Sequence, residues 1–198
     1  MQRLNLLIIV FSFSILNVNA QADTLVIERQ FMDYSSLIIA KDYEKALDYT
    51  NEEFFKIIPK DQMITLLKRT LNSNEMEFIP HLPIISDFQN TKNINGKIYV
   101  KFISSSTLEM KEKENEESKG QTEKDRKLKL SLYKLSFENT FGVNNVKYNE
   151  QTKYFEVKTA KKVIASSDDK MKNWKFVIVE NERQKKLLER FIPKELMD

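Results

Sequence analysis

The chain of 198 residues has no cysteine, only three glycines and a single histidine. Without cysteine, disulfides, thiol nucleophiles and zinc–cysteine sites are excluded, so the fold depends on its hydrophobic core. The glycines, Gly96, Gly120 and Gly142, lie too far apart to form a dinucleotide fingerprint, a phosphate-binding loop or a G-x-S-x-G turn. These absences argue against the common nucleotide-dependent and thiol-dependent chemistries.

The single histidine also leaves a classical zinc site short of ligands, and the calcium-loop pattern is missing. His81 lies in the segment Pro80-His81-Leu82-Pro83, whose prolines favour an extended, exposed path. No neighbouring carboxylate or serine in the sequence suggests an oriented general base, so we interpret His81 as a loop residue. We predict no cofactor and no metal site, and we assign no catalytic residue.

The excess of one sign of charge over the other is also small. The 32 lysines and arginines nearly balance the 29 aspartates and glutamates, which leaves a formal net charge of +3. A protein that binds nucleic acid usually concentrates a clear excess of basic charge on one face. We therefore expect no nucleic-acid partner.

The amino terminus has the three parts of a secretory signal peptide. Arg3 supplies a positive charge, Leu4 to Leu16 supply an apolar run of 13 residues, and small residues at Val18 and Ala20 precede Gln21. A bilayer-spanning helix needs about 20 apolar residues, so a permanent anchor is the weaker interpretation. We predict a signal peptide over residues 1–20, cleavage between Ala20 and Gln21, no membrane span after cleavage, and an exported protein that is periplasmic or extracellular.

The first third of the remaining chain has helical periodicity. Apolar residues recur at helical spacing from Thr24 to Ala40, which predicts an amphipathic helix. Asp42 is suited to cap a short second helix, and Thr50 with Glu53 has the spacing of a capping box for a further helical turn. The pattern from Asp61 to Leu71 predicts another helix.

The chain then changes to short apolar runs that are typical of strands. Asn95-Gly96 is a strong hairpin signal before the alternating Ile98, Val100 and Phe102. Trp174 could stack on a ligand, but its place at the head of an apolar strand favours core packing. The strands that we expect elsewhere cover Met76 to Ile79, Ile84 to Phe88, Val146 to Tyr148, Tyr154 to Ala165 and Trp174 to Val179.

Two helices and a charged segment interrupt or follow these strands. Leucines from Leu128 to Leu132 fit either a strand or a helix, and Gly142 favours a helix that ends at Phe141. Glu182 to Phe191 predicts a short C-terminal helix. Between the strands and the inserted helix, residues 109–127 hold 13 charged side chains and one apolar side chain, Met110. We predict a flexible, solvated insertion there, with docking of a partner as the lesser alternative.

This order of elements predicts a single α+β domain over residues 21–198. Its N-terminal helices should pack on a curved, mainly antiparallel sheet, with one inserted helix and a short C-terminal helix. The segments Lys41 to Thr50, Phe54-Phe55, Pro59 to Met63, Lys162 to Ala165 and Trp174 to Phe176 give the chain a diffuse pattern that resembles exported domains of the nuclear transport factor two-like family, the cystatin-like cone shared with SnoaL-type cyclases. That resemblance implies a cavity between helices and sheet, and the family includes both enzymes and binding proteins. The catalytic Asp–His pair of its enzymes matches no position in this chain.

Two functions therefore remain open. The first is an exported, non-enzymatic domain that binds a small apolar ligand or a protein partner. The alternative is a small cofactor-independent isomerase, dehydratase or hydrolase that uses carboxylate and tyrosine side chains in a cavity. A homodimer through the open face of the sheet is a third interpretation.

Overall fold

The computed structural model describes residues 24–114, 120–168 and 171–197. The predicted signal peptide, with Ala20 and Gln21 at its cleavage site, lies outside the described residues. The described chain forms an open antiparallel sheet of seven strands, with helices before it, one long helix inserted between strands, and a short helix near the C-terminus. The predicted α+β fold class is confirmed.

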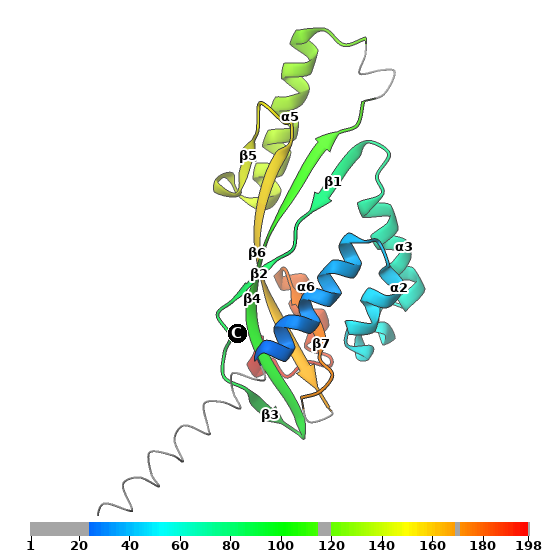
Figure 1. Cartoon of the computed structure of the whole chain (residues 1–198), viewed down its shortest axis with the longest axis vertical. Helices are drawn as coiled ribbons and strands as arrows, with labels where there is room; N and C mark the ends of the chain where they lie inside the picture. Colours follow the sequence, from blue (N-terminus) through cyan, green and yellow to red (C-terminus); the bar gives the residue numbers. More distant parts are fainter. Residues whose placement is uncertain (1–23, 115–119, 169–170, 198) are drawn as a thin grey trace, which may run out of the picture.

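Two long strands form the centre of the sheet. β4 (Lys97–Glu112) pairs with β6 (Phe155–Ser167) from Ile98↔Ser167 to Met110↔Phe155. The free edge of β4 takes three short strands in turn, β1 (Met76–Pro80), β2 (Ile84–Ser86) and β3 (Lys92–Ile94). The free edge of β6 takes β5 (Val146–Tyr148) near its start and β7 (Lys175–Val179) near its end. Figure 1 shows β4 and β6 as a long twisted pair through the middle of the molecule.

The N-terminal helix, which covers residues 24–39, packs on one face of the sheet where β4 begins and β6 ends. Ile27 and Phe31 are buried there, and the ring of Phe31 meets those of Phe102 and Phe176 edge to face at 5.0 and 5.1 Å between centroids. We call this group the first-helix core. Its buried members are Ile27, Phe31, Val100, Phe102, Val163, Ala165, Trp174 and Phe176.

The opposite face of this half of the sheet is covered by the C-terminal segment, because successive strand residues point to opposite faces. Here α6 (Glu182–Leu188) and η4 (Lys194–Leu196) bury their apolar side chains against β4, β6 and β7. The buried members of this C-terminal core are Tyr99, Ile164, Val177, Leu188, Ile192, Leu196 and Met197.

The other half of the sheet is covered by α5 (Glu123–Phe141), which Figure 1 shows beside the far end of the β4–β6 pair. Gly142 ends this helix as predicted, with φ +92°. We call the cluster beneath it the α5 core. Its buried members are Met110, Val146, Phe155 and Val157.

The helices between the N-terminal helix and the sheet are short. Asp42 caps α2 (Tyr43–Ala46) as predicted, and α2 continues into the 3₁₀ turn η1 (Leu47–Tyr49). The predicted capping box at Thr50 is wrong by one residue. Asn51 caps the 3₁₀ helix η2 (Glu52–Lys56), while Thr50 forms an isolated bridge to Phe176. The last of these helices is α3 (Lys60–Leu71).

The prediction of a flexible insertion over residues 109–127 is wrong at both of its ends. Residues 109–112 complete β4, and Met110 is only 3% exposed because it belongs to the α5 core. At the other end, Thr122 and Asp125 form a capping box that begins α5. The high charge of residues 109–112 did not indicate a strand. Pairing with β1, and with β6 as far as Met110, supplies the backbone hydrogen bonds of a strand whatever the charge of its side chains. Residues 115–119 lie outside the described part.

Candidate functional site

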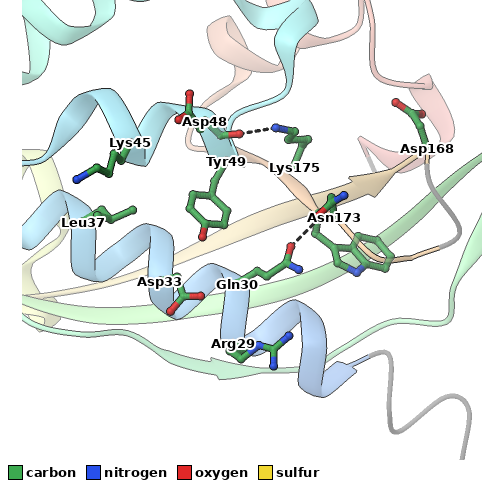
Figure 2. Close-up of a pocket in the computed structure, with 11 residues that line it drawn as sticks. Arg29, Gln30, Asp33, Leu37, Lys45, Asp48, Tyr49, Asp168, Asn173 and Lys175 are labelled. Carbon is green, nitrogen blue, oxygen red and sulfur yellow. Dashed lines mark hydrogen bonds between the residues drawn. The ribbon is translucent and has the colours of Figure 1, made fainter.

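A cleft of about 820 Å³ lies between the N-terminal helix, η1 and the start of β7. Figure 2 shows these elements as its walls, with the labelled side chains gathered around a common space. Its size falls within the range of small-molecule sites in proteins, about 300 to 1,000 Å³. The isolated bridge between Thr50 and Phe176 holds η1 beside β7 and so fixes the distance between two of the walls.

The N-terminal helix contributes Arg29, Asp33 and Leu37, which are four residues apart and therefore share one face. The neighbouring face carries Ile27 and Phe31 into the first-helix core. Burial of that apolar face determines the rotation of the helix, and the rotation in turn directs Arg29 and Asp33 toward the cleft.

Gln30 connects this helix to the segment just before β7. Its side-chain Nε2 donates to the carbonyl oxygen of Lys172 at 2.7 Å, and its Oε1 accepts from the backbone N–H of Trp174 at 2.7 Å. Trp174 itself is 1% exposed and donates from its indole nitrogen to the Met171 carbonyl. The tryptophan is a core residue, as the sequence favoured, and its backbone forms part of the cleft wall.

The wall formed by η1 is held by two lysines that contact Asp48. Lys175 of β7 donates from its side chain to the backbone carbonyl of Asp48, as Figure 2 shows. The carboxylate of Asp48 forms an ion pair with Lys60 at 2.6 Å. Both groups of Asp48 therefore serve the structure of this wall.

Tyr49 lies at the centre of the cleft. Its ring stacks on Phe176 with centroids 6.4 Å apart, and Figure 2 shows its hydroxyl turned toward the N-terminal helix. The pKa of Tyr49 is raised, first by burial and then by the carboxylates of Asp33 and Asp48. The hydroxyl therefore stays protonated at neutral pH and can donate a hydrogen bond.

The cleft lining has as many cations as anions, but only some of these side chains form polar contacts with other described residues. Its cations are Arg29, Lys45 and Lys175, and its anions are Asp33, Asp48 and Asp168. Lys45 pairs with Asp42 at 2.7 Å and Asp168 with Lys97 at 3.3 Å. Neither Arg29 nor Asp33 forms an ion pair with any residue that the structure describes. These two side chains and the Tyr49 hydroxyl are the groups of the cleft that can bind a ligand without breaking a structural contact.

A second hollow of about 720 Å³ lies on the open face of the sheet around His81. The backbone N–H of His81 donates to the Thr107 carbonyl, and its Nε2 lies 2.8 Å from Oε1 of Glu109. His81 is an exposed loop residue, as predicted, but the inference that no carboxylate lies near it is wrong. Glu109 is 28 residues away in sequence, and the pairing of β1 with β4 brings it to the histidine.

This hollow is open to solvent. The side chain of His81 is 48% exposed and that of Glu109 is 28% exposed. Leu82 and Ile84 add exposed apolar surface at its rim, at 49% and 74%. A histidine oriented by a carboxylate can accept and return a proton.

No local feature of the sequence marks Arg29, Asp33 or Tyr49 as a site residue. A helix pattern places Arg29 and Asp33 on a polar face, which most surface helices have. Nothing local relates them to Lys175, which the sheet brings to the cleft from 142 residues beyond Asp33.

In comparisons with known proteins, the chain matches no family model, no curated protein and no solved structure. Among the described helices, none combines the length and the apolar character needed to cross a bilayer. The described residues also contain no cluster of three or more His, Asp or Glu side chains placed to hold a metal ion.

Proposed function

We propose that this protein is an exported, non-enzymatic binding domain that holds a polar ligand, or the polar tip of a protein partner, in the cleft beside the N-terminal helix. One observation carries the proposal. Arg29, Asp33 and Tyr49 face a common space of about 820 Å³ while the other charged groups around it are engaged in structural contacts.

The lining indicates the chemistry of the ligand. Arg29 offers a guanidinium to a carboxylate or phosphate group. Asp33 can accept a hydrogen bond from an amine, an amide or a hydroxyl group, and the Tyr49 hydroxyl can donate one to an amide or hydroxyl oxygen. A ligand that carries both an anionic group and a hydrogen-bond donor fits this arrangement.

A polar ligand is favoured over the small apolar ligand that the sequence suggested. A cavity of the nuclear transport factor two-like kind would lie between helix and sheet. That space is filled by the rings of Phe31, Phe102 and Phe176, which contact one another. Membership of that family stays a prediction.

Native mass spectrometry of the protein purified from its own host tests the binding proposal. We expect a bound mass on the wild-type protein that is lost, or bound at least about tenfold more weakly, in Arg29→Gln and Asp33→Asn, since each removes one charge-assisted hydrogen bond. Glu28→Gln is the matched control, because Glu28 is an exposed acid of the same helix outside the cleft lining. Equal binding by Asp33→Asn and Glu28→Gln would contradict the proposal.

Export is tested separately by the intact mass of the same preparation. We expect the mass of a chain that begins at Gln21, either unmodified or with its N-terminal glutamine cyclised. A chain that retains residues 1–20 would remove this part of the proposal and leave the cleft untouched.

The second candidate function is acid–base catalysis at His81, and the observation that favours it is the 2.8 Å contact between His81 and Glu109. Incubation with a metabolite extract of the host, followed by mass spectrometry, would reveal a compound that is consumed. Under this alternative His81→Gln and Glu109→Gln abolish the consumption and Asp33→Asn preserves it. Consumption that survives in His81→Gln excludes it.

A further inference from the structure

The long helix α5 has two apolar faces, and only one of them is covered. Leu130, Tyr133, Phe137 and Phe141 pack on the α5 core. The opposite face carries three leucines that are largely exposed, at 61%, 58% and 56%. We call Leu128, Leu132 and Leu135 the leucine stripe.

The stripe follows from the helical repeat. Leu128, Leu132 and Leu135 are spaced by four and three residues, so they align along one side of the helix. An outward helix face is usually polar, and contiguous exposed apolar surface marks an interaction site more often than scattered single residues do. Figure 1 shows α5 at one end of the molecule, away from the N-terminal helix, α2 and α3.

We propose that the leucine stripe is the contact surface for a second copy of this chain, with the two α5 helices antiparallel about a two-fold axis beside Ser131. In this arrangement the three leucines of one copy interdigitate with the three of the other. The two Leu132 side chains lie next to the axis, and Leu128 of each copy meets Leu135 of its partner.

Charge complementarity points to this occupant and this orientation. Lys124, Ser131 and Glu138 are seven residues apart, so they line one edge of the stripe. A two-fold axis at Ser131 sets Lys124 of each copy opposite Glu138 of the other.

In the single chain these charges are at most weakly paired. Lys124 forms no ion pair with any described residue. The side chain of Glu138 is 18% exposed, and its one ion contact is at 3.7 Å to Lys134 of its own helix. On the other edge of the stripe, Lys129 already pairs with Glu112 of β4. The charge of Lys129 is therefore compensated where the two copies approach each other.

The oligomeric state of the protein purified from its own host is the first test. Because three leucines per copy form a small interface, we expect a concentration-dependent dimer in sedimentation velocity over roughly 1 µM to 1 mM. Leu132→Glu should weaken it by at least about a hundredfold, since every dimer loses two buried leucines. The matched control is Leu66→Glu, which changes a 53% exposed leucine of α3. Both leucines are exposed in the single chain, so neither variant disturbs the core.

Charge exchange tests the orientation. Glu138→Lys should weaken the dimer because it sets Lys124 against a lysine, and the double variant Lys124→Glu with Glu138→Lys should restore it. Since the chain has no cysteine, single cysteines report distance directly. Ser131→Cys should cross-link with a short bismaleimide. Asn139→Cys should not, because the two copies of that residue lie about 24 Å apart along the antiparallel helices at 1.5 Å per residue.

Several results would overturn this inference. A protein that remains monomeric over the whole range excludes the dimer, as does binding of the stripe to vesicles of anionic lipid by a monomer. A dimer that persists in Leu132→Glu lies on another surface, such as the open face of the sheet. Cross-linking of Asn139→Cys would show parallel helices, in which the two copies of every residue lie at the same height. None of these outcomes bears on the cleft, so the proposed function is tested independently.

Discussion

At the scale of single residues, Gln30 connects the N-terminal helix to the segment that leads into β7, about 140 residues away in sequence. Its amide satisfies the backbone N–H of Trp174 and the carbonyl of Lys172 at once. A buried backbone N–H without a partner is costly, so this one side chain stabilises both the core and the wall of the cleft.

We predict that Gln30→Ala lowers the free energy of unfolding by about 1–3 kcal/mol, because the N–H of Trp174 loses its acceptor. Gln30→Glu should lose less, since its carboxylate can still accept from Trp174 while only the bond to Lys172 is lost. Urea denaturation of the three proteins measures the difference. Equal stability of Gln30→Ala and wild type would mean that water replaces the side chain, and that the bond does not stabilise the fold.

The role of a residue could be predicted from the sequence where the groups that it contacts lie nearby in the chain. Asp42 caps α2 and Gly142 ends α5 because each acts within its own turn. The pairing of His81 with Glu109 could not be anticipated, because it depends on the register of β4 beside β1. Arg29 and Asp33 were visible only as polar positions on an amphipathic helix.

At the scale of elements, two glycines have positive φ, one in the turn between two strands and one at the end of a helix. Gly96 lies in the tight turn between β3 and β4, where Asn95 also has positive φ, and nothing lies within 4 Å of an added Cβ. Gly142 follows α5 at φ +92° and ψ +141°, a conformation that is almost exclusive to glycine. An added Cβ there would lie 3.4 Å from Nδ2 of Asn145.

We predict that Gly96→Ala lowers the free energy of unfolding by about 1 kcal/mol, the cost of left-handed backbone alone. Gly142→Ala should cost about 2–3 kcal/mol, because its conformation is more restricted and because Asn145 must shift from its 2.7 Å bond to the Phe141 carbonyl. Thermal or urea denaturation measures both. The reverse order of the two costs would show that the end of α5 relaxes freely.

The charged residues 109–127, whose ends belong to β4 and α5, are the part of the chain where the prediction from sequence was least accurate. High charge predicts that a segment cannot build a core of its own. It does not exclude a strand whose neighbours supply hydrogen bonds, as β1 does for residues 109–112 and β6 does for Glu109 and Met110. Nor does it exclude the start of a helix whose packed face is formed by residues farther along the chain, such as Leu130 and Tyr133.

At the scale of the whole molecule, the sheet has two unequal halves. One half is covered on both faces, by the first-helix core and the C-terminal core. The other half is covered on one face, by the α5 core. Between them β4 carries the polar run Ser104 to Thr107, paired with Lys158 to Lys161 of β6.

We predict that the two halves open at different free energies. Native-state hydrogen exchange should find that amides of β7 and of the end of β6 exchange only on global unfolding. Amides of β5 and α5 should exchange through a smaller opening, because less apolar surface covers them. Phe155→Ala should lower protection mainly in the α5 half, while Phe102→Ala should lower it throughout. A single exchange energy for both halves would contradict this division.

The sequence alone determined the fold class, the sequence of helices and strands and most of their ends, because periodicity, caps and turn residues act over a few neighbouring positions. Tertiary structure decided everything that depends on distant partners. The alignment of β1 and β4 places His81 against Glu109. The packing of the N-terminal helix next to β7 gathers Arg29, Asp33 and Tyr49 around one cleft. The rotation of α5 on its core leaves a row of leucines facing outward, because a helix with two apolar faces can bury only one of them against a single sheet.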